Sequence, residues 1–278
     1  MTNFHVAKKR MKSAALIALL LSLCLMSACG TRSHDTTIVA GSTSVQPYAE
    51  VLAEEYAHVC PESEIDIQGG GSSAGITAVE SGTADIGMSS RVLNEKEQGL
   101  WFVEIAKDGL AIIVHPSNPV ESLTLAQICG IYGATALSWG ELGGRDAKIH
   151  VITREEGSGT RDAFISLVMG KERITPKAIV QDSNGAVRML VADDPNAIGF
   201  ISLGLVDDTV KEIKLDGVEP SFANIMNGSY TLFRPFLFVT AQEPSGEVKA
   251  FIDYALSPEG QRVLVHEGLI PAEEGAGR

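Results

Sequence analysis

The sequence has little cysteine, little positive charge and no long apolar run beyond its first 30 residues. It contains 4 cysteines, 6 scattered histidines and 22 lysines and arginines against 35 aspartates and glutamates in 278 residues. Because no Cys/His cluster has metal-ligand spacing, we expect no metal, and we expect no cofactor either. The formal net charge of −13 argues against nucleic acid as a partner. The length allows one large or two medium domains.

One apolar run, over 14–26, stands near the N-terminus. Four basic residues precede it: Lys8, Lys9, Arg10 and Lys12. The run is too short to span a bilayer comfortably, and this layout is typical of a secretion signal. It ends at Met26-Ser27-Ala28-Cys29-Gly30, which resembles the bacterial lipobox. We therefore expect a signal peptide over 1–28, a lipid on Cys29 and a polar tether over 29–36. A transmembrane anchor with an incidental cysteine is the alternative.

Removal of the signal peptide makes the chain more acidic. It takes away four of the 22 basic residues and none of the 35 acidic ones, which leaves 18 against 35 and a formal charge of −17. Any bound anion must then be held by local donors and dipoles against an unfavourable overall field. An enclosed cleft is expected rather than a basic surface patch. Cys60 and Cys129 are interpreted as small buried apolar residues, with a disulfide between them as the alternative in an oxidising compartment.

Three stretches place small residues between a short apolar strand and the start of a helix. They are Gly41–Ser44, Gly69–Gly75 and Arg154–Thr160. Free backbone N–H groups and partial positive charge at a helix start attract an anion, glycine lets the backbone approach it, and serine or threonine adds hydroxyl donors. Together the three loops predict a tetrahedral anion held by converging helix starts. Each loop alone is equally well explained as a turn that ends a strand.

Strand and helix patterns alternate along the chain. Strands are expected over 37–40, 65–67, 85–88, 110–114, 149–152, 198–201 and 213–215, with an extended apolar segment over 230–239. Helices are expected over 47–58, 76–81, 124–131, 162–169, 187–192, 246–256 and 258–267. Such alternation predicts parallel sheets in an α/β fold, with ligands at the carboxyl ends of the strands.

The chain is expected to form two lobes. The punctuated segment His115-Pro116-Ser117-Asn118-Pro119 follows a buried strand and predicts a crossing into a second lobe, and the extended segment over 230–239 predicts the return. Lobe one then comprises 37–114 and 231–278, and lobe two comprises 115–230. Both ends of the chain fall in lobe one.

Five motifs in order make the chain resemble the substrate-binding protein of a phosphate ABC transporter over nearly its whole length. They are Gly41-Ser42-Thr43-Ser44 with Pro47, Gly71–Gly75, Asp85–Arg91, Arg154 with Gly157–Thr160, and Ala197–Phe200. The resemblance implies the two-lobed α/β periplasmic-binding-protein fold of type II. Each lobe is then a mostly parallel sheet flanked by helices, and two crossover segments act as the hinge.

The resemblance also implies a function without catalysis. The protein is expected to be a monomeric, lipid-anchored receptor outside the cytoplasmic membrane, on the extracellular face or in a periplasm. It is expected to close on inorganic phosphate and deliver it to the permease and ATPase subunits of the transporter. A surface protein that senses phosphate or adheres, without a permease, would have the same binding site.

The resemblance further implies which residues bind phosphate. Lobe one is expected to offer Thr43, Ser44, Ser72 and Ser90, and lobe two to offer Arg154, Ser158, Gly159 and Thr160. Arg154 is the only cation in this set, and its guanidinium fork suits a phosphate better than an ammonium group does. Arg91 is expected either to orient its loop through a salt bridge or to be solvated. Asn184 opens a helix and has two interpretations: a side chain that faces the cleft, and a plain helix cap, which is preferred.

Ser90 departs from the pattern of the family. Many relatives have an aspartate there, which accepts a hydrogen bond from the protonated phosphate oxygen and rejects unprotonated sulfate. Ser90 still accepts that hydrogen bond but does not repel sulfate as a carboxylate would. Another tetrahedral oxyanion such as sulfate is therefore an alternative ligand, and Glu155 or Glu156 is a candidate for the missing acceptor.

A function of a different class is also open. Gly71-Ser72-Ser73-Ala74-Gly75 matches the G-x-S-x-G nucleophile elbow, with Ser73 as the nucleophile of a secreted serine hydrolase. His150 and His266 are available as bases, but neither follows a clear strand in a turn-rich loop. The elbow also explains neither of the other two small-residue loops.

Overall fold

The computed structural model describes residues 36–272 of the chain. The predicted signal peptide over 1–28, the lipid site at Cys29 and nearly all of the tether lie outside these residues. The first strand, β1, begins at Thr36. No helix within residues 36–272 is long and apolar enough to cross a membrane.

The first part of the chain builds a parallel sheet. β1 (Thr36–Gly41) pairs in parallel with β2 (Glu64–Gly69) on one side and with β3 (Ile86–Ser89) on the other. The helices α2 (Gln46–Val59) and α3 (Ser72–Glu80) connect these strands. Parallel neighbours require such crossover helices, so the alternation of strand and helix in the sequence is explained.

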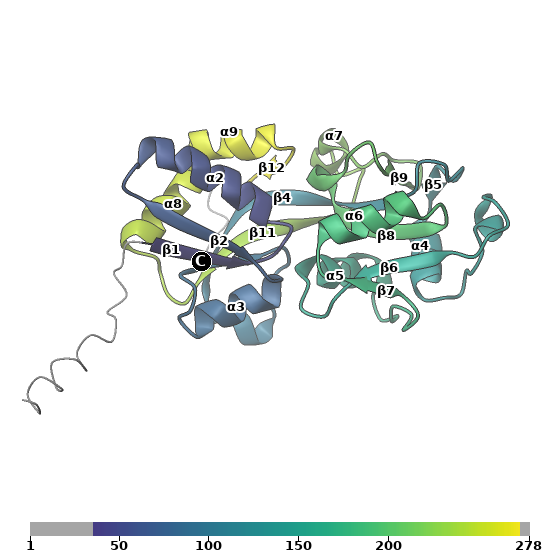
Figure 1. The fold of residues 1–278 in the computed structure, drawn as a ribbon, viewed down its shortest axis with the longest axis horizontal. Coiled ribbons are helices and arrows are strands. Elements are labelled where there is room, and N and C mark those ends of the chain that lie inside the picture. The colour runs from purple at the N-terminus through teal and green to yellow at the C-terminus, as the bar shows by residue number, and fades with distance from the viewer. Residues whose placement is uncertain (1–35, 273–278) are drawn as a thin grey trace, which may run out of the picture. The chain divides into compact units, whose positions relative to one another are not determined.

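Two long antiparallel strands join this sheet to a second one. β11 (Phe233–Thr240) pairs with β3 and with β4 (Trp101–Val114), so all three lie side by side (Figure 1). Residues 101–109 of β4 pair with β11, whereas 110–114 pair with β8 (Ala197–Ser202). β8 is followed in the sheet by β6 (His150–Arg154) and β7 (Ile179–Gln181), both parallel to their neighbours.

The hydrophobic core falls into groups on either side of this change of partner. Alternate residues of β11 pack into different clusters, with Phe236 and Phe238 in one and Leu237 and Val239 in another. β4 alternates in the same way from Leu110 onward. Because successive strand residues point to opposite faces, both sheet faces are covered at the central strands β4 and β11. The elements around β1–β3 are called lobe one below, and those around β6–β8 lobe two.

Helices cover the faces of each lobe. In lobe one, α2 packs against α8 (Gly246–Leu256) and α9 (Pro258–His266), and α3 packs against β1 and β3 (Figure 1). In lobe two, α6 (Asn184–Asp193) packs on β8, while α4 (Leu125–Tyr132) and α5 (Gly159–Phe164) pack beside the π-helical turn η3 (Ile165–Met169). The remaining short elements are β5 (Ser122–Leu123), β9 (Lys211–Glu212), β10 (Lys214–Leu215), β12 (Ile270–Pro271), α7 (Phe222–Met226), η1 (Glu95–Glu97), η2 (Trp139–Leu142) and η4 (Leu203–Leu205).

Several sequence expectations need correction in detail. The helices expected from residues 76 and 162 begin earlier, at Ser72 and Gly159, so part of each small-residue loop is already helical. β4 is also longer than the strand expected over 110–114, because residues 101–109 pair with β11. The predicted lobe boundaries stay predictions. By strand pairing alone, Leu110–Val114 lies with β8 of lobe two, ahead of the expected crossing.

The interpretation of the cysteines as buried residues is wrong for one of them. Cys60 is exposed and Cys129 is half-buried, and both are free thiols. Cys60 is the C-cap residue of α2, just past the end of the helix. The alternative of a disulfide between the two is not formed in this structure.

Candidate functional site

The three small-residue loops lie at the carboxyl ends of β1, β2 and β6. The loops after β1 and β2 belong to lobe one, and the loop after β6 belongs to lobe two. The second and third loops contact each other across the two lobes. The backbone N–H of Ser73 donates to the carbonyl oxygen of Gly157 at 3.1 Å. A Cβ placed on Gly159 would overlap Ser72 Oγ and lie 2.6 Å from Ser90 Oγ. The loops therefore converge, and glycine at 159 permits the close approach.

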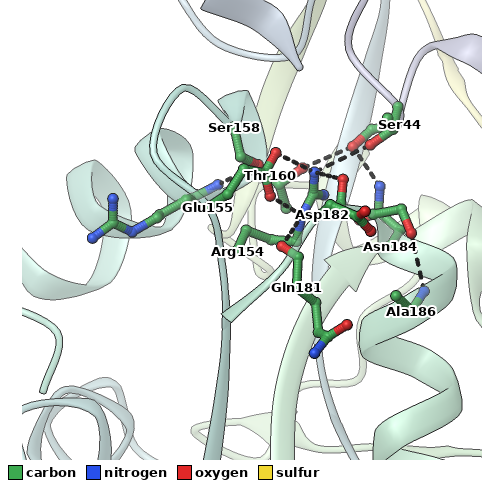
Figure 2. A network of polar contacts seen from close by, with 12 residues as sticks. Ser44, Arg154, Glu155, Ser158, Thr160, Gln181, Asp182, Asn184 and Ala186 are labelled. Carbon is green, nitrogen blue, oxygen red and sulfur yellow. Dashed lines mark hydrogen bonds and ion pairs between the residues drawn. The ribbon is translucent and has the colours of Figure 1, made fainter. Parts of the chain in front are cut away.

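Two hydroxyls from opposite lobes meet directly. Ser44 Oγ and Thr160 Oγ1 are 2.7 Å apart, and both side chains are buried (Figure 2). Thr160 lies in the first turn of α5, which Ser158 caps by accepting a hydrogen bond from the Arg161 N–H at 3.3 Å. Ser44 lies one residue before Val45, the N-cap of α2. Of the predicted site residues, Ser44 and Thr160 thus meet where the two lobes touch.

Arg154 is the buried cation of the site. It ends β6, is 1% exposed, and forms a fork with Glu155, in which Nε and Nη2 donate to the two carboxylate oxygens at 2.9 Å each (Figure 2). Nη2 also donates to Thr43 Oγ1 of lobe one at 3.2 Å and to the Asp182 carbonyl oxygen at 3.0 Å. Nη1 is buried and has no hydrogen-bond partner within residues 36–272. A buried guanidinium N–H without a partner is costly, so this atom calls for an acceptor.

Three buried serines form a cluster, and two of them, Ser72 and Ser90, lie next to Gly159. Ser42 Oγ donates to Ser90 Oγ at 2.9 Å, the Ser90 N–H donates to Ser72 Oγ at 3.1 Å, and the Ser72 and Ser90 hydroxyls are 3.4 Å apart. All three are at most 2% exposed. A hydroxyl both donates and accepts, so this cluster can face either a protonated or an unprotonated oxygen. Ser42 is a neighbour that the sequence interpretation did not single out.

The two glutamates considered as substitute acceptors differ in position. Glu155 accepts hydrogen bonds from Arg154 on both carboxylate oxygens. The side chain of Glu156 is 94% exposed and lies 4.0 Å from Arg161. Glu156 is therefore solvated, and Glu155 is already engaged with the cation.

Ser44 has two further partners, and sequence reasoning missed one of them, Arg234. The interpretation of Asn184 as a cap is wrong, because Ser183 caps α6 and Asn184 Nδ2 donates to Ser44 Oγ at 2.8 Å instead (Figure 2). Arg234 Nη2 donates to the same oxygen at 3.1 Å. A signal for Arg234 was present, since an arginine within the apolar segment Phe233–Val239 must be buried with a partner. That partner is Asp108, on the adjacent strand.

Arg91 forms a salt bridge and is not solvated. Its guanidinium binds Glu97 through two hydrogen bonds of 2.7 and 2.9 Å, and its Nε lies 3.0 Å from Asp162 Oδ2 of α5 in lobe two. Burial raises the pKa of Glu97, but hydrogen bonds from Arg91 and the Asn94 backbone outweigh this and lower it below the usual glutamate range. The Arg91 ion pairs thus connect the β3 loop with the other lobe.

Within residues 36–272, Ser73 of the nucleophile elbow has no hydrogen bond with a histidine. Ser73 Oγ accepts a hydrogen bond from Arg91 Nη2 at 3.3 Å. His150 pairs with Asp194 at 2.6 Å, and His266 contacts Glu267 at 3.2 Å, so each candidate base is engaged with its own carboxylate. A serine hydrolase needs the base within hydrogen-bond reach of the serine. Within residues 36–272, no group of three or more His, Cys, Asp or Glu side chains is arranged to hold a metal ion.

A family model and curated relatives both match most of the chain. Residues 28–259 match the PBP superfamily domain. The chain is 32% identical over 250 residues to the phosphate-binding protein PstS of Bacillus subtilis, covering 87% of this chain and 83% of that one. It is 33% identical to the PstS protein of Pseudomonas aeruginosa, covering 83% and 81%.

Solved structures agree with the sequence relatives. A putative phosphate ABC transporter substrate-binding protein from Clostridium perfringens, solved with bound phosphate, superposes with a TM-score of 0.84 at 45% identity, covering 86% of this chain and all of that one. An ABC-type phosphate transport receptor from Vibrio cholerae gives 0.72 at 41% identity, covering 84% and 99%. The predicted two-lobed α/β fold is confirmed. These relatives are binding proteins, so the serine hydrolase alternative is wrong.

Proposed function

The chain belongs to the PBP superfamily and, within it, to the family of the phosphate-binding protein PstS, and we propose that it binds inorganic phosphate between its two lobes for an ABC transporter. The observation that carries this proposal is the convergence of loops from both lobes beside Arg154 Nη1, which is buried without a partner among the described residues. A ligand that contacts both lobes favours their closed arrangement, because only differential contact shifts such an equilibrium. The function involves no chemical step.

Each lobe contributes four of the residues that are proposed to bind phosphate. Lobe one offers Thr43, Ser44, Ser72 and Ser90, and lobe two offers Arg154, Ser158, Gly159 and Thr160. Their contacts support this assignment, because Arg154 reaches Thr43, Thr160 reaches Ser44, and Gly159 lies against Ser72 and Ser90. Glu155 holds the Arg154 fork so that Nη1 is left for the anion. Charge-assisted hydrogen bonds of this kind are among the strongest that a protein makes.

The proposal includes the setting of the receptor in the cell. It works outside the cytoplasmic membrane, as a monomer held by a lipid on Cys29, and it delivers phosphate to the permease and ATPase subunits of the transporter. The lipobox-like segment Met26–Gly30 and the transporter relatives support this setting. Membrane fractionation of the full chain, with and without Cys29→Ser, tests the anchor.

Calorimetry with Arg154→Ala tests the binding site. Residues 36–278 form one compact unit, so a protein that begins at residue 36 serves for the titration. We expect phosphate to bind tightly to the wild type and at least about 100-fold more weakly to the variant, because the anion loses its buried cation. Arg188→Ala is the matched control, since Arg188 pairs with Asp207 outside the site. Equal affinity in wild type and Arg154→Ala would contradict the assignment.

The serine cluster keeps a second ligand open. Ser42, Ser72 and Ser90 hydrogen-bond to one another and to backbone groups, and a hydroxyl accommodates an unprotonated oxygen as readily as a protonated one. Sulfate, or another tetrahedral oxyanion, is therefore the second candidate. A titration of the same protein with sulfate decides between them, because heat equal to that of phosphate would remove the claim of phosphate specificity.

A further inference from the structure

Five buried side chains form a closed circuit of hydrogen bonds that joins both lobes to the strands between them. Asp108 Oδ2 accepts from Arg234 Nη2 at 3.0 Å, Arg234 Nη2 donates to Ser44 Oγ at 3.1 Å, and Asn184 Nδ2 donates to Ser44 Oγ at 2.8 Å. Ser202 closes the circuit, since its N–H donates to Asn184 Oδ1 at 3.3 Å and its Oγ to Asp108 Oδ1 at 2.8 Å. None of the five is more than 2% exposed. We call this set the polar ring.

The ring includes residues of both lobes and of the two strands that connect them. Asp108 lies on β4 and Arg234 on β11, directly opposite each other in the ladder that connects the lobes. Ser44 belongs to the first loop of lobe one, whereas Asn184 starts α6 and Ser202 ends β8 in lobe two. The ring is therefore complete only when Ser44 meets lobe two.

The direction of each hydrogen bond in the ring is fixed by chemistry. Arginine can only donate, so Arg234 gives a hydrogen to Ser44. Asn184 receives a backbone N–H on its oxygen, so its amide nitrogen must face Ser44 and donate as well. These two donors fill both lone pairs of Ser44 Oγ. Its single hydrogen must then point to its remaining partner, Thr160 Oγ1, 2.7 Å away.

This direction of the Ser44 hydrogen bond makes the Thr160 hydroxyl an acceptor from Ser44 and leaves its own hydrogen free to donate. Among the described residues, the Thr160 side chain has no hydrogen bond besides the one to Ser44. Thr160 lies beside Gly159, which touches Ser72 and Ser90 of the proposed phosphate site. The ring thus sets Thr160 as a hydrogen-bond donor toward the anion.

We infer that Arg234, braced by Asp108, is a positioning residue of the anion site, which acts through Ser44 to commit the Thr160 hydroxyl to the bound anion. The inference rests on the proposed function. Two buried guanidinium nitrogens support it, since Arg234 Nη1, like Arg154 Nη1, has no hydrogen-bond partner within residues 36–272. Burial lowers the pKa of Arg234, Asp108 raises it, and the nearby charge of Arg154 lowers it again. A bound anion relieves this repulsion between the two arginines.

The test is a double-mutant cycle on phosphate affinity, measured by calorimetry with the protein from residue 36. Arg234→Met is expected to weaken phosphate binding by about 10- to 100-fold, because the loss of one hydrogen bond to a charged group has an effect of this size. Thr160→Val removes the hydroxyl that the ring positions. In the Thr160→Val background, Arg234→Met should cost at most about a further twofold, because no hydroxyl is left to direct. Arg188→Met is the matched control and should bind phosphate like the wild type.

A second variant keeps the test decisive if Arg234→Met does not fold. Removing one member of a buried ion pair leaves a charge alone, whereas replacing both by apolar residues is often tolerated. Asp108→Leu/Arg234→Met is therefore measured in the same cycle, with the same expected losses. Rescue of affinity by Arg234→Lys, which restores a donor, would support the inference further, and additive losses in either cycle would overturn it.

The outcomes separate the inference from the proposed function. A wild type that does not bind phosphate overturns both. A wild type that binds phosphate, with Asp108→Leu/Arg234→Met binding equally well, overturns the inference alone and leaves the proposed receptor function in place.

Discussion

At the scale of the residue, the site is defined by which polar atoms are buried and what they bind. Arg154 has a carboxylate fork on one side and a free Nη1 on the other, which suits it to an anion that needs one cation and several hydroxyls. Ser90 is the residue on which the choice of anion depends. It lies among hydroxyls, which neither attract a proton nor repel an unprotonated oxygen as a carboxylate does.

Ser90→Asp tests this role of the serine cluster. A carboxylate there accepts a hydrogen bond from protonated phosphate and repels sulfate, so the ratio of phosphate to sulfate affinity is expected to rise at least about tenfold. Both affinities are measured by calorimetry on wild type and variant. Ser89→Asp is no suitable control because Ser89 is also buried, so Ser81→Asp, at an exposed position after α3, serves instead. An unchanged ratio in Ser90→Asp would show that selectivity is set elsewhere.

At the scale of the element, the helix starts hold the site, and close packing between them limits what each can carry. α5 begins at Gly159, and its first residues face the start of α3 at Ser72. The sequence located all three loops because glycine and serine at a helix start are local signals. The helix starts predicted from the sequence at residues 76 and 162 were too late, because small residues have the same sequence pattern in the first turn of a helix as in a loop.

Gly159→Ala tests the close approach of α5 to lobe one. The added methyl group meets Ser72 and Ser90 only while the lobes are together, so phosphate affinity should fall about tenfold or more. The melting temperature without phosphate should change little, since alanine is favourable in a helix. Gly185→Ala is the matched control, because Gly185 also lies at a helix start and a Cβ there meets open space. Equal losses in both variants would contradict the packing argument.

At the scale of the whole molecule, one continuous set of strands connects two lobes, and ion pairs cross between them. β4 changes its partner from β11 to β8 without a break, so the connection between the lobes is part of the sheet. Arg91 links the β3 loop to Glu97 within lobe one and to Asp162 in lobe two. These pairs also make the stability of the fold depend on pH.

Glu97→Gln tests this dependence. Because Arg91 holds the pKa of folded Glu97 below its unfolded value, the stabilisation is complete above the usual glutamate range and is lost as the pH falls through the folded value. The variant should lose about 2 kcal/mol of unfolding free energy at pH 7, and the difference should shrink toward pH 3. Urea unfolding at several pH values measures it, with exposed Glu95→Gln as the control. A difference that does not vary with pH would contradict the assignment.

The sequence by itself determined the local features of this protein: the secretion-signal layout, the order of strands and helices, the three small-residue loops and the single arginine beside the third. Each is readable because it depends on neighbours within a few residues, such as a glycine before a helix or an apolar run in a strand. Family motifs added the fold and the class of ligand.

Only the tertiary structure decided the wider set of contacts. Ser44 binds Asn184, which is 140 residues away in the sequence, and Arg234, which is 190 residues away. Arg234 in turn binds Asp108, which is 126 residues away. No local pattern marks such partners, because burial of a charge is satisfied by whichever polar group the sheet brings opposite to it. For the same reason the buried Asn184 side chain binds Ser44 of the other lobe, while Ser183 caps its helix.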